Sequence, residues 1–156
     1  MDKNNQTAGE TAIQIYDYEG SQISFATGEN VMVNATQMAK KFGKRVPDWL
    51  NNQQTKDFIE ALSEVRKSVS ADLVQVIKGG NPGEQGTWMH EDVAIEFARW
   101  LSPKFAIWCN DRIKELASGL NAQLKAAKKE GYGKILASLY EIRDVLKEAV
   151  AREVPN

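Results

Sequence analysis

Cysteine and histidine are nearly absent from this sequence, since one of each, Cys109 and His90, occurs among 156 residues. A single cysteine excludes an internal disulfide framework and is typical of a protein that works in a reducing compartment. Zinc sites in proteins use three or four His or Cys ligands, so we expect no zinc site and no other cofactor. Cys109 stands between apolar neighbours, which favours a buried thiol over a reactive one.

Long hydrophobic runs are missing as well. No apolar stretch approaches the ~18 residues of a membrane span, and the N-terminus lacks the apolar segment of a signal peptide. We therefore expect no membrane partner. Apolar residues make up 42% and charged residues 26% of the chain, which is typical of a globular protein and excludes wholesale disorder. The length predicts one domain with an appendage.

Charge is unevenly distributed, although the net charge is only −1. Residues 1–33 contain five acidic residues and one lysine, whereas residues 34–47 contain four basic residues and no acidic one. The four are Lys40, Lys41, Lys44 and Arg45. Such a block attracts a polyanion through its local field, whatever the net charge. Taken alone, however, the block favours the plainer interpretation of a solvated helix face.

Hydrophobic periodicity predicts a β-meander followed by helices. In residues 12–33, three stretches alternate between apolar and polar side chains, with turn residues between them. From Asn34 the period changes to 3.6, and Gln37 is placed to complete a capping box with Asn34. Gly43 ends this first helix, and Pro47 begins the next. Further helices are expected at 55–67, at 91–101, from Pro103 to Gly119, and beyond the Gly131-Tyr132-Gly133 interruption.

Residues 35–53 match a helix-turn-helix, in which two short helices are joined by a tight turn. Ala39 is small enough for the second helix to approach, and Gly43 can adopt the positive φ that the turn needs. The basic residues then lie where phosphates would pass. Residues 51–55, Asn-Asn-Gln-Gln-Thr, are expected on the second helix, where their side chains could meet base edges. The alternative is two packed helices with solvated lysines.

A second candidate element is a β-hairpin with a glycine-rich tip. Strands are predicted at 73–77 and 87–90, and residues 79–86 between them contain four glycines and one proline. A hairpin downstream of a helix-turn-helix is a wing, whose backbone N–H groups can approach a phosphate. The alternative is a loop that is merely flexible.

Enzymatic signatures are weak. The glycine loop is followed by Thr87-Trp88 and therefore fails the P-loop pattern. His90 is adjacent to two acidic residues, but neighbours on a helix do not face each other, so a structural hydrogen bond is the better interpretation. A nuclease would need Asp48, Asp57 and Glu60 to converge on a metal ion. We expect a protein that is not an enzyme.

Four blocks of the sequence together resemble the KilA-N domain. They are Asn34-Ala35-Thr36-Gln37-Met38-Ala39-Lys40-Lys41, Trp49-Leu50, Gly86-Thr87-Trp88-Met89-His90 and Ala94-Ile95-Glu96-Phe97-Ala98-Arg99-Trp100-Leu101-Ser102-Pro103-Lys104-Phe105-Ala106-Ile107-Trp108. The family occurs in bacteriophages, prophages and large DNA viruses and is related to the APSES DNA-binding domain of fungal transcription factors. The resemblance covers about residues 12–117 and implies a DNA-binding module with a winged-helix-like core. It also implies that Trp88, Trp100 and Trp108 lie in the core.

The resulting expectation is an α+β fold with a winged-helix-like core, an N-terminal β-meander and C-terminal helices. We expect a flexible N-terminus at 1–11, a DNA-binding domain at 12–118 and a helical extension at 119–156. The partner is double-stranded DNA, in transcriptional or replication control, in the bacterial cytoplasm or a virus-infected host cell. The candidate DNA-binding residues are Thr36, Gln37, Lys40, Lys41, Lys44, Arg45, Asn51, Asn52, Gln54, Lys78, Gly79, Gly80, Asn81 and Gln85.

One alternative function remains open. The same fold could be an antirepressor-like module that binds a protein and not DNA.

In the C-terminal extension, apolar residues are spaced 4-3-4-3, as in a coiled coil, which predicts a homodimer. These residues are Ile135, Leu139, Ile142, Leu146 and Ala149.

Overall fold

The structure is a computed structural model that describes residues 12–153, apart from the side chains of residues 120, 121, 123, 124, 132, 136, 152 and 153. The N-terminus predicted to be flexible, 1–11, lies outside the described residues. The chain divides into two units, Met1–Ala117 and Ser118–Asn156, which we call unit 1 and unit 2.

Unit 1 contains one five-stranded antiparallel sheet with the strand order β1-β2-β3-β5-β4. The strands are β1 Ala12–Tyr18, β2 Ser21–Thr27, β3 Val31–Asn34, β4 Val74–Ile77 and β5 Gly86–His90. The predicted meander and the predicted hairpin are therefore both present. What the sequence did not indicate is that they form a single sheet, because β3 pairs with β5 over Met32–His90, Val33–Met89 and Asn34–Trp88.

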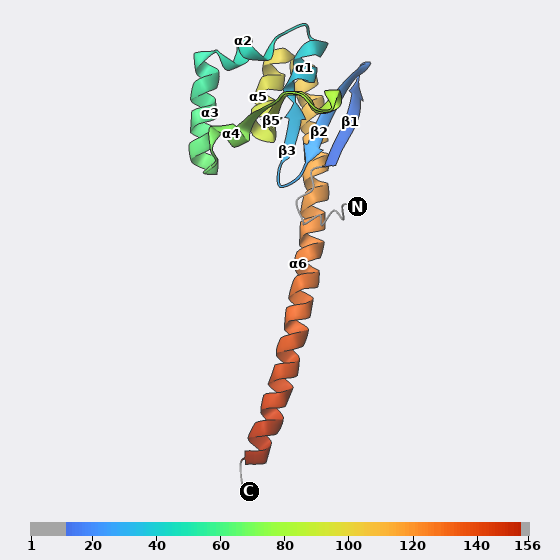
Figure 1. Cartoon of the computed structure of the whole chain (residues 1–156), viewed down its shortest axis with the longest axis vertical. Coiled ribbons are helices and arrows are strands. Elements are labelled where there is room, and N and C mark those ends of the chain that lie inside the picture. The colour runs from blue at the N-terminus through green and yellow to red at the C-terminus, as the bar shows by residue number, and fades with distance from the viewer. Residues whose placement is uncertain (1–11, 154–156) are drawn as a thin grey trace. The chain divides into compact units, whose positions relative to one another are not determined.

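The described residues also form six α-helices (Figure 1). They are α1 Ala35–Lys41, α2 Val46–Leu50, α3 Gln53–Arg66, α4 Ser70–Leu73, α5 Glu91–Leu101 and α6 Pro103–Glu153, and a 3-10 turn, η1, covers Pro82–Glu84. Figure 1 shows that α2 runs from α1 to α3 across one end of unit 1, while α3 and α4 stand on the side away from β1. The fold is α+β, as the sequence predicted.

The core of unit 1 forms where one face of the sheet meets the helices. Phe25, Val33 and Met89 from the sheet are fully buried, as are Phe97 of α5 and Phe105 at the start of α6. Aromatic rings reinforce this contact: the Tyr18 ring lies 4.9 Å from that of Phe105. Burial of this apolar area is the main stabilising contribution to the fold.

Four local expectations need correction. The second helix of the predicted helix-turn-helix, α2, has five residues and ends at Leu50, so residues 51–55 do not continue it. Leu73 ends a short helix, α4, and is not part of a strand. Helix α6 runs to Glu153 without a break at Gly119 or at residues 131–133, because a glycine within a helix costs only about 1 kcal/mol.

Burial also differs from the expected pattern at three side chains. Trp88 is buried, but Trp100 and Trp108 are only half-buried. The apolar spacing of the helix predicted at 55–67 also places Val65 on its inner face, but in α3 Val65 is 73% exposed. In the last turn of α3, the Val65 side chain therefore does not pack on the rest of unit 1.

His90 makes the predicted structural hydrogen bond, and the structure shows that it does so as the N-cap of α5. Its Nδ1 accepts a hydrogen bond from the Asp92 backbone N–H at 3.2 Å, which requires the neutral ring. Burial lowers the pKa of His90, although the Asp92 carboxylate opposes this shift and the Arg66 guanidinium adds to it.

The lowered pKa of His90 predicts a loss of stability on acidification. The unfolded chain takes up the proton at about pH 6.5, before the folded state does, so stability is complete above that pH and falls as the pH drops through it. We expect His90→Asn, which keeps an N-cap, to lose less free energy of unfolding between pH 7.5 and 5.5 than the parent. Partial burial raises the pKa of Glu91, and this shift is the same in the parent and in the variant. Equal losses in urea titrations at the two pH values would contradict the role given to His90.

Candidate nucleic-acid interface

Helix α1 presents two different outward faces. Gln37 and Lys41, four residues apart, both point to the β1–β2 hairpin: the Gln37 side-chain oxygen accepts from Ser24 N at 2.6 Å, and Lys41 Nζ donates to Glu19 O at 2.8 Å. Thr36 and Lys40 form the other pair and are exposed. Among the described residues, no hydrogen bond or ion pair involves the Lys40 ammonium.

The turn after α1 has the geometry that the sequence predicted. Gly43 has φ of +63°, which a side chain would strain, and the Lys44 N–H donates to Ala39 O at 3.0 Å. Arg45, the N-cap of α2, is exposed, and its guanidinium contacts no described acidic residue. Arg45 is thus a cation of this turn that has no ion-pair partner among the described residues.

Lys44 has an internal role that its sequence position does not reveal. Its Nζ lies 4.4 Å from the centroid of the Trp100 ring and donates to Trp100 O at 3.1 Å, at the end of α5. The side chain thereby fastens the α1–α2 turn to the C-terminus of α5, where a cation is favoured by the helix dipole.

We expect Lys44→Ala to lower the free energy of unfolding by about 1 kcal/mol, the sum of a surface cation–π contact and a hydrogen bond. Lys40→Ala removes the same charge without an internal contact and should stay within about 0.5 kcal/mol of the parent. Urea denaturation measures both. Equal effects would mean that the Trp100 contact contributes nothing.

The polar run 51–55 lies across the junction of α2 and α3. Asn52 is the N-cap of α3, and its side-chain oxygen accepts from Gln54 N at 2.9 Å. Gln53 donates to Asp57 at 2.9 Å, and Thr55 is buried. Asn51 and Gln54 are the side chains of this run that are exposed and have no described hydrogen-bond partner.

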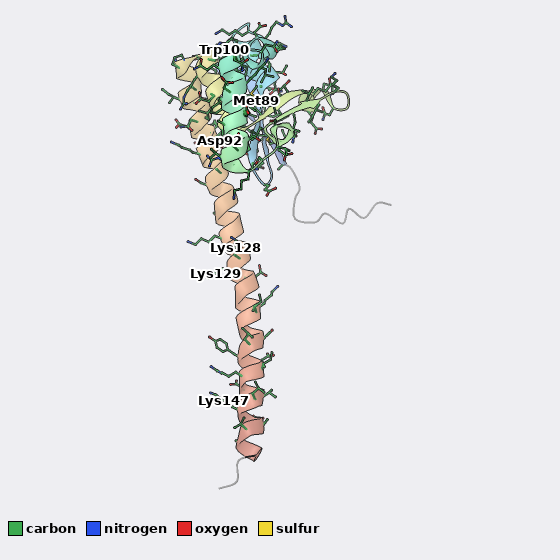
Figure 2. The ribbon with its side chains drawn as sticks, turned by 90° about the vertical axis from the view of Figure 1, so that its left-hand side faces the viewer. Met89, Asp92, Trp100, Lys128, Lys129 and Lys147 are labelled. Atoms are coloured by element: carbon green, nitrogen blue, oxygen red, sulfur yellow. The ribbon has the colours of Figure 1, made fainter. Side chains whose placement is uncertain are left out.

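The β4–β5 hairpin projects sideways from the body of unit 1 (Figure 2). Its tip is held by its own side chains: Asn81 accepts from Gly83 N at 3.1 Å, and Gln85 Nε2 donates to Gly80 O at 3.0 Å. Lys78 and the two following glycines, Gly79 and Gly80, are exposed. Asn81 and Gln85 therefore shape the loop, while Lys78 remains available to a ligand.

Two hydrogen bonds fasten the loop end of β5 in this hairpin to the start of α1. Thr36 Oγ1 accepts from Thr87 N at 2.9 Å, and Asn34 Nδ2 donates to Gln85 O at 3.0 Å, while Asn34 Oδ1 also caps α1. Since a helix rises about 1.5 Å per residue, the basic end of α1 lies only about 8 Å along its axis from this junction. The hairpin and the basic turn are thus parts of one continuous surface.

Sequence reasoning missed the acidic neighbour of the basic block. Glu19, in the β1–β2 turn, accepts from Lys41 through its backbone oxygen and from Lys104 through its carboxylate at 3.3 Å. The Glu19-Gly20 turn was visible in the sequence, but its position beside α1 depends on the sheet and could not be read from local pattern.

Metal-ligating side chains, the single cysteine and the apolar character of the helices also bear on what the described part of the chain can do. No group of three or more His, Cys, Asp or Glu residues there could hold a metal ion. The Cys109 thiol is buried, as the sequence predicted. Burial raises its pKa to about 12, so the thiol stays protonated near neutral pH. None of the described helices has the length and apolar character to cross a membrane.

Comparisons with known proteins find a matching family model and several related viral proteins. Residues 16–119 match the family model of the KilA-N domain. Two KilA-N domain-containing proteins of Acanthamoeba polyphaga mimivirus are each 33% identical, over 85 and 73 residues, which is 51% and 46% of this chain. An uncharacterized protein of fowlpox virus is 22% identical over 85 residues, which is 51% of this chain and 55% of that protein.

The chain spans only 24% and 20% of the length of the two mimivirus relatives. Among solved structures, the chain is similar to one described as a DNA complex of PCG2, with 18% sequence identity and a TM-score of 0.29. That match covers 69% of this chain and 88% of the other.

Proposed function

We propose that this chain, which belongs to the KilA-N domain family, binds double-stranded DNA with the surface formed by α1, the α1–α2 turn and the β4–β5 hairpin. The observation that carries the proposal is the attachment of the hairpin to α1 through Thr36 and Asn34. This attachment fixes a projecting β-element beside exposed cations. Such a combination suits a duplex, in which phosphates and grooves alternate over short distances.

Within this surface, the side chains take different roles. Lys40 and Arg45 would contact phosphates directly because nothing described in the chain engages them. Lys41 would contribute its remaining N–H groups, and Lys44 would hold the turn in place. In the hairpin, Lys78 and the backbone of Gly79 and Gly80 would reach a neighbouring phosphate or groove.

Sequence readout would come from the α2–α3 junction. Asn51 and Gln54 are exposed amides without a described partner, and amides can bond bidentately to adenine. Asn52 and Gln37 would support them indirectly, since their side-chain oxygens cap α3 and hold β2, respectively. Such a module would serve transcriptional or replication control without catalysis, in a phage-infected bacterium or in a virus-infected host cell.

Self-association belongs to the same proposal. The apolar spacing in unit 2 would join two or more copies, and a duplex would then meet several binding surfaces at once.

The direct test is fluorescence anisotropy of the full chain with a random-sequence duplex over a salt series. We expect the logarithm of the association constant K to fall linearly with the logarithm of the salt concentration, with a slope of about −0.9 for each phosphate contact. An antirepressor-like module that binds protein alone would show no salt-sensitive signal, and that result would reject DNA binding. Enrichment of a motif from a random duplex library would then separate sequence readout at Asn51 and Gln54 from phosphate binding alone.

A further inference from the structure

We propose that four copies of this chain assemble through parallel α6 helices in unit 2, where the spacing alone suggests two. This inference rests on the self-association part of the proposed function and adds its stoichiometry and direction. The surface concerned, which we call the seam, consists of Ile135, Leu139, Ile142, Leu146 and Ala149.

The seam is uncovered in the described chain. The exposed fractions of its large side chains are 56% at Ile135, 54% at Leu139, 55% at Ile142 and 59% at Leu146. Leucine and isoleucine side chains exposed in a row on one helix face represent an apolar patch of the kind that marks an interface. Their heptad spacing is that of a helix that packs against other helices in a coiled coil. The flanking valines, Val145 and Val150, make this helix complementary to copies of itself, so we take the occupant to be further copies of this chain.

The register of the seam is unambiguous. A heptad places position d three residues after position a, and the next a four residues after d. The step from Leu139 to Ile142 is three residues and that from Ile142 to Leu146 is four. Leucine therefore occupies the a positions, and isoleucine occupies the d positions at 135 and 142.

This choice of side chains discriminates between oligomeric states. β-branched residues at a with leucine at d favour two strands, whereas leucine at a with isoleucine at d shifts the preference to three or four. The reason is geometric, because the a and d side chains enter their holes at different angles in each assembly. The sequence has the second arrangement.

Flanking residues favour four strands, in which each helix contacts two neighbours and must bury a wider stripe. Val145, at a g position, and Val150, at an e position, widen the apolar surface on both sides of the seam and are 65% and 60% exposed. A four-stranded arrangement buries more apolar area for each helix.

The same flanking residues set the direction. In a parallel bundle, a g residue meets the e residue five positions later on the neighbouring helix, so Val145 packs on Val150. In an antiparallel bundle, e positions face one another, and Arg143 would meet Arg143 or Val150 of a neighbour. Either contact would be unfavourable, since it joins two like charges or places a charge on an apolar side chain.

The test is the mass of the full chain in solution without DNA, by sedimentation equilibrium at tens of micromolar. We expect four times the chain mass of 17.4 kDa. The sharpest variant exchanges the two residue types without changing composition, as Ile135→Leu, Leu139→Ile, Ile142→Leu and Leu146→Ile. It should assemble as two copies, because isoleucine then occupies a and leucine occupies d.

Two further variants define the surface. Ile142→Glu should give a single copy, and Ala137→Glu, the same change to glutamate off the seam, should leave four. A parent chain of one, two or three copies would overturn the proposal, and so would an exchange variant that keeps four copies. Because no DNA is present, this failure is distinct from loss of DNA binding, which the anisotropy series measures separately.

Discussion

We expect the double variant Lys40→Ala/Arg45→Ala to bind a random duplex about 60-fold more weakly than the parent at 0.1 M salt, if each side chain holds one phosphate. Each phosphate contact releases counterions, and its loss flattens the slope of log K against log salt by about 0.9. The double variant should therefore show a slope about 1.8 less steep. Neither side chain has a described internal partner, so its removal acts on binding and spares the fold.

The matched control is Lys129→Ala/Lys147→Ala, which removes the same charge from exposed positions on α6 (Figure 2). If Lys40 and Arg45 act through their positions on the DNA-binding surface, the control variant should keep the parent affinity within about twofold and should also keep the parent slope. Equal weakening by both double variants would show that only net charge matters. The surface assigned to α1 and its turn would then be wrong.

The second large effect is expected at Gly86, where the β4–β5 hairpin meets α1. Gly86 has φ of +120°, and a Cβ there would lie 2.8 Å from Thr36 Oγ1 and 3.2 Å from Asn34 Oδ1. Alanine would combine a backbone conformation that is nearly restricted to glycine with a clash at the two side chains that fasten the hairpin. We expect Gly86→Ala to lower the free energy of unfolding by about 3 kcal/mol, from strain and a lost hydrogen bond.

Gly83→Ala provides the comparison within the same loop. A Cβ at Gly83 meets Asn81 Oδ1 at 3.6 Å, an ordinary contact, so its effect should stay within about 0.5 kcal/mol. Thermal and urea denaturation of both variants measure the difference. If Gly86→Ala were as stable as Gly83→Ala, the junction between hairpin and α1 would be looser than described, and the single continuous surface would lose its support.

The local elements of this fold could be predicted well because each has a signal within a few residues. Asn34 at a helix start, Gly43 after its end and the alternation in residues 12–33 require no knowledge of the rest of the chain, and the structure confirms all three. Helix α5 has the predicted bounds because its apolar stripe and its cap at His90 agree. Consistency between cap and periodicity made these predictions secure.

Errors occurred where tertiary contacts decide the outcome. Periodicity could not show that α2 ends after five residues. The helix ends there because the chain begins a separate helix, α3, whose N-cap is Asn52. The glycines in α6 suggested breaks, yet their cost is small against the propensity of the surrounding residues.

For the candidate site, the basic residues were predictable, but their differences were not. Lys41 and Lys44 are engaged by Glu19 and Trp100, whose positions depend on the sheet and on α5. The side chains of Lys40 and Arg45 point in other directions from α1 and its turn, and they reach neither of these partners. The assignment of all four residues to DNA stays a prediction, as do the contacts of the hairpin.

The most direct measurement of the central claim is amide hydrogen exchange of the full chain with and without a duplex. If α1, the turn and the hairpin form one DNA-binding surface, DNA should slow exchange together in peptides covering residues 35–52 and 76–86. Peptides covering 28–32, at the β2–β3 turn, should exchange at unchanged rates. Protection confined to one of the two segments, or found instead at the β2–β3 turn, would contradict the account.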